Sequence, residues 1–165
     1  MFTNGSRTVP FDVNPGDQTI VLRNDVAATY QAGTTAGTLV FTVEVGGFTE
    51  QASTVIAADP VRIDKATAVR TGSGIELTLS GFDNSRSIGD LSFTFYGADG
   101  QPLAGMPIKA NAASDFGNWW NTSTTGGIFQ LRAVFPVTGD ASKITGVKAS
   151  VVNTVGTAST DKLSF

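Results

Sequence analysis

Hydrophobic and polar residues alternate along most of this chain, which is the pattern of β-strands that bury one face. Helical spacing of hydrophobic residues is nearly absent, so the sequence predicts an all-β fold. The alternation is clearest over residues 39–45 and 129–135, where every second side chain is apolar. Proline and glycine separate the runs, and we expect strands over 9–13, 20–22, 39–45 and 48–57, then over 61–70, 75–79, 91–95, 106–108, 118–121, 129–135, 147–151 and a last one ending at Phe165.

The dipeptide Asp59-Pro60 divides these strands into unequal parts. Proline fixes its own φ and favours an extended residue before it, so the connection is short and stiff. Residues 59–165 carry seven or eight strands at intervals of about 8 to 12 residues, which predicts a complete immunoglobulin-like or fibronectin-III-like sandwich. Residues 1–58 carry only four or five, so we expect a short, incomplete sandwich that lacks the strands preceding Arg7. The predicted fold class is a tandem pair of β-sandwiches.

An incomplete sandwich exposes an edge or an apolar groove, and such surfaces are filled by a neighbouring domain, another subunit or a donated strand. We expect the groove to be lined by the inward rows of residues 1–58, namely Val9, Phe11, Leu39, Phe41 and Val43. The expected partner is therefore protein, either a second copy or an adjacent module of the same protein.

Composition removes several other functions. Only 15% of residues are charged, the net charge is −3 and no run of like charge exceeds two residues, so we expect neither nucleic acid nor a membrane surface as a partner. No apolar run approaches the roughly 20 residues of a membrane span. Cysteine and histidine are both absent, which removes the usual zinc ligands and the Ser-His-Asp and Cys-His arrangements. We therefore expect no catalytic residue, no metal and no cofactor.

The opening residues 1–6 lack the charged and apolar regions of a secretory signal. Two explanations fit. Either the chain is a piece or mature form of a secreted protein, or it is made and used without a signal, as in a virus particle. We favour the first, which predicts an extracellular or cell-surface location.

The pair Trp119-Trp120 is the most conspicuous candidate for ligand binding. On a strand, neighbouring side chains point to opposite faces, so one indole should enter the core and the other should lie on the surface. We favour a structural role. The alternative is that the exposed indole stacks on a sugar ring, with Asn118, Asn121 and Thr122 supplying hydrogen bonds.

The aspartates offer two further interpretations. Asp83, Asp90 and Asp99, with Asn84 nearby, are the hard oxygen ligands that calcium prefers, but their spacing matches no recognisable calcium loop and we favour turn capping. Asp115 with one of them would give a carboxylate pair for glycoside cleavage, an interpretation that we also disfavour.

A family resemblance rests on residues 127–131 (GIFQL), 135–137 (FPV) and the spaced residues Ile144, Val147, Asn153, Gly156 and Ser159. This end of the chain resembles the end of bacterial Ig-like and fibronectin-like modules. More narrowly, residues 32–39 (AGTTAGTL), Asp59-Pro60 and the aromatic segment 116–120 look like a two-module unit near the end of long secreted proteins of soil bacteria. The resemblance implies an extracellular β-module with no catalytic residue to carry over.

Three functions follow as hypotheses. The first is a non-enzymatic extracellular structural module, completed by strand donation or packing from a neighbour and able to form a filament. The second is a carbohydrate-binding adhesin module that uses Trp119 or Trp120. The third is an Ig-like decoration domain of a virus particle.

Overall fold

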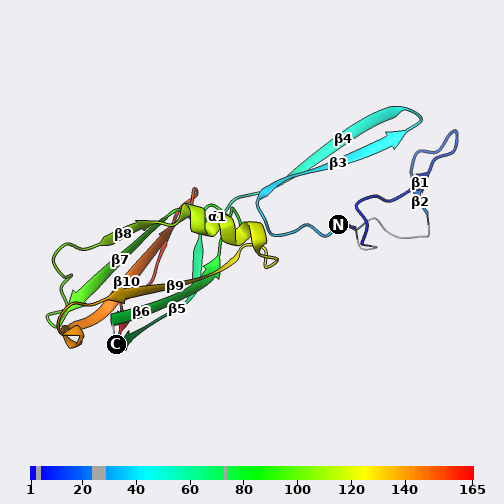
Figure 1. Cartoon of the computed structure of the whole chain (residues 1–165). Coiled ribbons are helices and arrows are strands. Elements are labelled where there is room, and N and C mark those ends of the chain that lie inside the picture. Colours follow the sequence, from blue (N-terminus) through cyan, green and yellow to red (C-terminus); the bar gives the residue numbers. More distant parts are fainter. Residues whose placement is uncertain (3–4, 24–28, 73) are drawn as a thin grey trace. The chain divides into compact units, whose positions relative to one another are not determined.

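The computed structural model describes residues 1–2, 5–23, 29–72 and 74–165, which form two compact units, Met1–Gly33 and Thr34–Phe165 (Figure 1). The protein is mostly β, with several antiparallel sheets, as the alternation predicts. No helix in the described part of the chain is long and apolar enough to cross a membrane. The division predicted at Asp59-Pro60 concerns folding domains and stays a prediction.

The unit Met1–Gly33 holds two short antiparallel strands, β1 (Phe11–Asp12) and β2 (Val21–Leu22). The chain turns at Pro15-Gly16 between them, but the strands are shorter than predicted and Val13 and Ile20 lie outside them, both exposed. Two strands of two residues each bury little apolar surface. The pairing therefore stays short, although apolar and polar residues continue to alternate beyond it.

In the unit Thr34–Phe165, two antiparallel sheets pack face to face, and we call them the two-sheet body. The first sheet has the order β5-β6-β9 and the second the order β11-β10-β7-β8, with β12 also paired to β10. Their bounds are β5 (Arg62–Thr71), β6 (Gly74–Phe82), β7 (Asp90–Gly97), β8 (Ile108–Asn111), β9 (Ile128–Pro136), β10 (Ile144–Val152), β11 (Thr157–Ser159) and β12 (Leu163–Ser164). Most of these strands lie within a few residues of their predicted positions.

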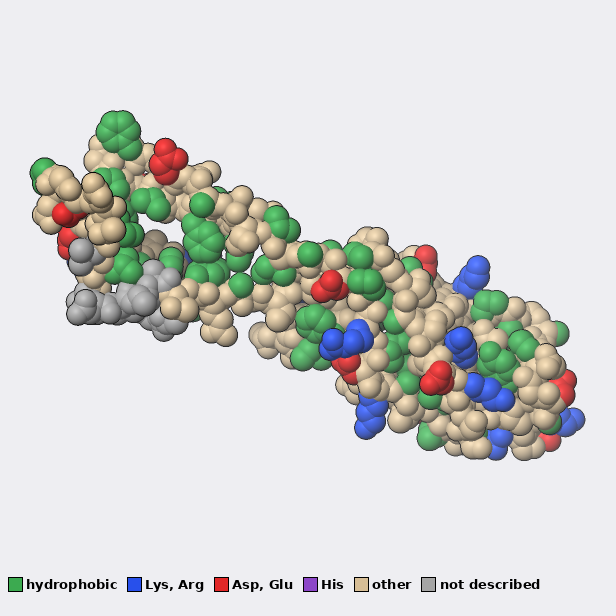
Figure 2. All heavy atoms as spheres, turned by 180° about the vertical axis from the view of Figure 1, so that it is seen from behind, with side chains coloured by type: hydrophobic (Ala, Val, Ile, Leu, Met, Phe, Trp, Pro, Cys, Tyr) green, Lys and Arg blue, Asp and Glu red, His purple; other side chains and the backbone are tan. Residues whose placement is uncertain are grey.

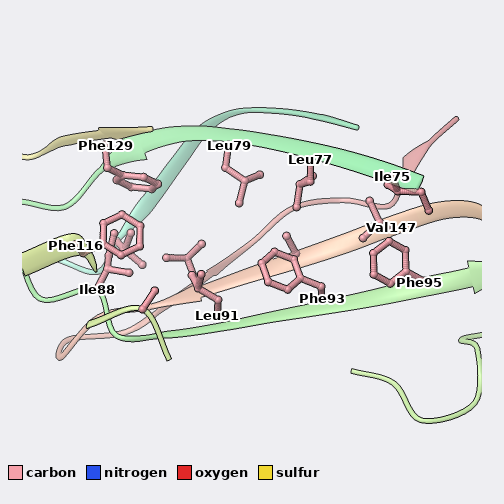
Figure 3. Close-up of a cluster of buried hydrophobic side chains, with 14 of the residues drawn as sticks. Ile75, Leu77, Leu79, Ile88, Leu91, Phe93, Phe95, Phe116, Phe129 and Val147 are labelled. Atoms are coloured by element: carbon pink, nitrogen blue, oxygen red, sulfur yellow. The ribbon is translucent and has the colours of Figure 1, made fainter. Parts of the chain in front are cut away.

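The core lies between the two sheets (Figure 3). Ile75, Leu77 and Leu79 of β6 are fully buried, and they face the buried row of Leu91, Phe93 and Phe95 on β7. Removing each such side chain from water stabilises the fold by roughly 1.5–3 kcal/mol. The rows predicted from alternation are therefore the observed core, which β10 completes with Val147, Ala149 and Val151.

The strand predicted at 118–121 is wrong, because these residues belong to a helix, α1 (Ala113–Thr122). Ala112, Phe116 and Trp120 are all buried, and their spacing of four residues places them on one helical face. Phe116 stacks on Trp120 and meets Phe129 edge-on, with ring centroids 5.3 and 5.7 Å apart. This buried stripe holds α1 against the core.

Residues 37–56 form a hairpin of two nine-residue strands, β3 (Gly37–Val45) and β4 (Phe48–Ile56). Both strands were predicted and both are confirmed, and Gly46-Gly47 form the turn between them. The turn glycines have φ of 54° and 86°, and positive φ at both central residues is what a tight two-residue hairpin turn of type I′ requires.

Candidate interaction surface

The hairpin β3–β4 carries one apolar face. Pairing places Val45 opposite Phe48, so the row Leu39, Phe41, Val43 and Val45 continues onto β4 through Phe48 on the same side. We call these five residues the apolar hairpin face. Phe48 is 82% exposed, and Val43 and Val45 are more than 40% exposed. A two-stranded hairpin is marginal in water by itself, so this face is suited to being covered by a partner.

The opposite face of the hairpin is mostly polar. Thr42 and Gln51 face each other there and share a hydrogen bond of 3.2 Å, and Glu44 lies opposite Thr49. Val40 and Val55 are the apolar residues on this side, and both are exposed. The two faces therefore differ in chemistry, and only one offers a continuous apolar row.

Asn84 holds the base of the hairpin through three hydrogen bonds. Its side-chain amide donates to the carbonyl of Ala57 at 2.8 Å, its side-chain oxygen accepts from the amide of Asp59 at 2.9 Å, and its own carbonyl accepts from the amide of Ala36 at 2.8 Å. Ala36 precedes β3, whereas Ala57 and Asp59 follow β4, so one residue fixes both ends of the hairpin.

Asp83, the neighbour of Asn84, is fully buried and organises the loop between β6 and β7. Its carboxylate accepts from the backbone amides of Ser85, Ser87 and Ile88, at 3.0, 2.7 and 3.1 Å. It also accepts from the Ser85 hydroxyl and from the side-chain amide of Asn153, at 2.6 and 2.9 Å. Five protein donors satisfy both oxygens, so this carboxylate caps a loop.

The other two aspartates that were weighed as calcium ligands serve separate loops. Asp90 accepts from the side chain of Asn111 at 2.8 Å, and Asp99 accepts from the amide of Gln101 at 2.9 Å. Among the residues that the structure describes, no three acidic side chains gather as a metal site would require.

The predicted groove residues fall on two units. Val9 and Phe11 lie in the unit Met1–Gly33, where both are half-buried, and Leu39, Phe41 and Val43 lie on the hairpin of the other unit. The structure brings the last three together on the apolar hairpin face. A groove shared with Val9 and Phe11 stays a prediction.

Trp120 is 5% exposed and Trp119 is 42% exposed, which is the division between core and surface that we predicted, although on a helix rather than a strand. The Trp119 indole donates to the carbonyl of Ile128 at 3.4 Å. Asn121 follows Trp119 by two residues and is therefore turned about 160° away around the helix axis. The structure does not bring Asn121 beside the exposed indole.

A second apolar feature escaped the sequence analysis. At the end of the two-sheet body where β6 begins, a cavity of about 210 Å³ opens between the edge strands β8 and β9. We call it the β8–β9 pocket. Its walls are mostly apolar and include Leu103, Met106, Ile108, Phe135, Val137 and Ile144. These residues come from segments that are far apart in the sequence. The alternation of apolar residues within single strands was the only sequence pattern that pointed to any of them.

Several lining residues of the β8–β9 pocket have charged neighbours in the sequence. Lys109 follows Ile108 and Lys143 precedes Ile144, both lysines are exposed, and neither forms an ion pair with a described residue. Arg70 donates to the Ile144 carbonyl at 2.6 Å. Hydrogen bonds from the Ser142 hydroxyl and amide hold the pKa of Asp140 below its usual range, which keeps this carboxylate ionised.

No protein-family model matches the chain, and no curated protein or solved structure was found to be similar to it. The function must therefore be inferred from the chemistry of the apolar hairpin face and the β8–β9 pocket.

Proposed function

We propose that this protein is a non-enzymatic extracellular structural module that works by self-association through the apolar hairpin face. The observation that carries the proposal is a hairpin that forms a two-stranded sheet of its own, with an apolar row on one face that ends at Phe48, which is 82% exposed. Covering that row would remove apolar surface from water on both partners, which is the main favourable term in protein association. Packing from a second copy, or from another segment of the same protein, completes the hairpin.

The division of strands between the two sheets supports the proposal that the two-sheet body is an Ig-like or fibronectin-III-like module. In the two-sheet body, the first, second and fifth strands, β5, β6 and β9, share one sheet, and the third, sixth and seventh, β7, β10 and β11, share the other. This division is that of strands A, B, E and C, F, G in an immunoglobulin sandwich. The fourth strand, β8, pairs with β7. Such modules commonly serve in cell-surface proteins, in keeping with the proposed location.

Two matched valines test the proposal. Val43 lies on the apolar hairpin face and Val40 on the opposite face of the same strand, with exposed fractions of 43% and 55%. In sedimentation equilibrium over a wide concentration range, the wild type is expected to associate, Val43→Lys to remain monomeric and Val40→Lys to associate as the wild type does. A wild-type chain that stays monomeric, with hairpin amides as protected from hydrogen exchange as the core, would overturn the proposal.

Trp119 supports carbohydrate binding as a second candidate function. Its indole is 42% exposed on α1, and an exposed aromatic ring offers a flat surface for a sugar ring. A glycan array of the wild type and Trp119→Ala tests this function. Binding that Trp119→Ala removes would support it, and the absence of any bound glycan would count against it.

A further inference from the structure

We infer that the β8–β9 pocket receives the hairpin tip of a second copy of this chain, with Phe48 as the inserted side chain. The inference rests on the proposed function, because it names the site at which the apolar hairpin face would be received. Four observations carry it: the size of the pocket, the exposure of Phe48, the charges on the two surfaces and the positions of both features in the unit Thr34–Phe165.

The size and the chemistry of the β8–β9 pocket suit a phenylalanine ring. A dry apolar cavity of about 150 Å³ is enough to hold benzene, and the β8–β9 pocket measures about 210 Å³. Its walls include Phe135, Met106 and Leu103, which suit an aromatic ring through edge contacts and a polarisable sulfur. Phe48 follows the turn glycines directly, so its ring sits at the tip of the hairpin, where it meets no bulky neighbour from the loop.

The charges are complementary. Glu44 and Glu50 are the only charged residues between positions 37 and 56, so the hairpin carries two negative charges and no positive one. Near the β8–β9 pocket, Arg70 donates to the carbonyl of the lining residue Ile144. Lys109 and Lys143 each stand next to a lining residue in the sequence, and Asp140 lies two residues after the lining residue Thr138. In the view of Figure 2, Lys and Arg side chains are spread over the two-sheet body. An acidic tip that approaches this rim gains attraction, which weakens with added salt.

The positions favour contact between copies. Asp83 and Asn84, which hold the base of the hairpin, follow the last residue of β6, whereas Ile75 at the start of β6 lines the pocket. The base of the hairpin and the pocket thus lie at opposite ends of the nine-residue strand β6, about 30 Å apart. A contact between unlike surfaces leaves a free tip on one copy and a free pocket on the other, so further copies add to it in a chain or a closed ring.

The test uses matched pairs of full-length variants. Phe48→Ser removes the inserted ring, and Val55→Ser is its control on the opposite face of the hairpin, where Val55 is 70% exposed. Ile108→Lys places a charge in the pocket, and Ile128→Lys is its control on β9, where Ile128 is 55% exposed and outside the pocket. Sedimentation equilibrium should show association weakened about 10- to 100-fold for Phe48→Ser and at least as much for Ile108→Lys. The two controls should associate as the wild type does.

Mixing the two defective variants gives the sharpest readout. The Phe48→Ser chain keeps an intact pocket and the Ile108→Lys chain keeps an intact tip, so the mixture should form a one-to-one dimer that grows no further. A mixture that stays monomeric although each variant is folded by circular dichroism would overturn the inference. So would Phe48→Ser and Ile108→Lys chains that assemble as the wild type does.

A second measurement needs no substitution in the pocket. Methyl NMR signals of Leu103, Met106 and Ile108 should shift with concentration in the wild type and stay fixed in Phe48→Ser. Fixed signals in an associating wild type would overturn the inference even if Ile108→Lys failed to fold. If Val43→Lys abolishes association while Phe48→Ser and Ile108→Lys leave it unchanged, self-association through the hairpin stands and only the pocket is excluded as its receptor.

Discussion

The neighbouring indoles Trp119 and Trp120 have opposite environments, and this difference sets their expected contributions to stability. Trp120 stacks on Phe116 in the core, so Trp120→Ala should lower the free energy of unfolding by about 3–5 kcal/mol. Trp119 is 42% exposed, and Trp119→Ala should cost less than about 1 kcal/mol. Urea denaturation followed by circular dichroism measures both. Equal losses for the two variants would contradict the placement of α1.

The buried carboxylate of Asp83 gives a second prediction at the scale of residues. Asp83→Asn keeps the shape of the side chain but turns an NH₂ group toward backbone donors, which leaves amides such as that of Ser87 unsatisfied. We expect a loss of about 3 kcal/mol in the free energy of unfolding. Asp64→Asn is the control, because Asp64 pairs with Arg62 on the surface and such pairs contribute less than about 1 kcal/mol. Similar losses in both variants would mean that Asp83 does not organise its loop.

Among the elements, strands were predictable from sequence and α1 was not. Every second residue of β6 is apolar and buried, so the period of two could be read without ambiguity. In α1, the polar segment around Trp119-Trp120 hides the spacing of four that joins Ala112, Phe116 and Trp120. The hydrogen bond between Asp83 and Asn153 joins residues 70 positions apart, which no local pattern encodes.

The pairing of β6 with β9 gives a prediction about pH. Arg132 holds Glu76 across this pair at 2.7 Å, and its hydrogen bonds lower the pKa of the Glu76 carboxyl below the ordinary value of 4.5. A carboxyl with a lowered pKa in the folded state adds stability above its unfolded pKa and loses it as the pH falls through the folded pKa. Glu76→Gln should therefore lose less stability than the wild type between pH 7 and pH values below about 4.

The measurement is the free energy of urea unfolding at several pH values for the wild type and Glu76→Gln. Glu50→Gln serves as the control, since Glu50 lies on the hairpin and forms no ion pair with a described residue. The effect is small because the guanidinium is well exposed. Parallel pH profiles for wild type and Glu76→Gln would show that the ion pair contributes nothing to this sheet.

For the whole molecule, the location of the core predicts which parts of the chain support folding. All the buried hydrophobic side chains among the described residues lie from Val61 to Val151. A chain of residues 34–165 should therefore unfold with a free energy within about 1 kcal/mol of the full chain, since removal of residues 1–33 takes no side chain from that core. Thermal and urea unfolding of the two chains give the comparison.

Removing the hairpin as well should cost more, although the hairpin adds nothing to the core. A chain of residues 61–165 loses the Asn84 bonds to Ala36, Ala57 and Asp59 and the bond from the Asn153 side-chain amide to the Asp59 carbonyl. At about 1 kcal/mol for each hydrogen bond, the expected loss is about 4 kcal/mol relative to residues 34–165. Restoring most of that loss with Asn84→Ser, whose shorter side chain can be hydrated, would identify Asn84 as the main cause. If residues 61–165 were as stable as residues 34–165, the hairpin would be held by the turn and strand pairing alone, and its base would be free to change direction when a partner binds.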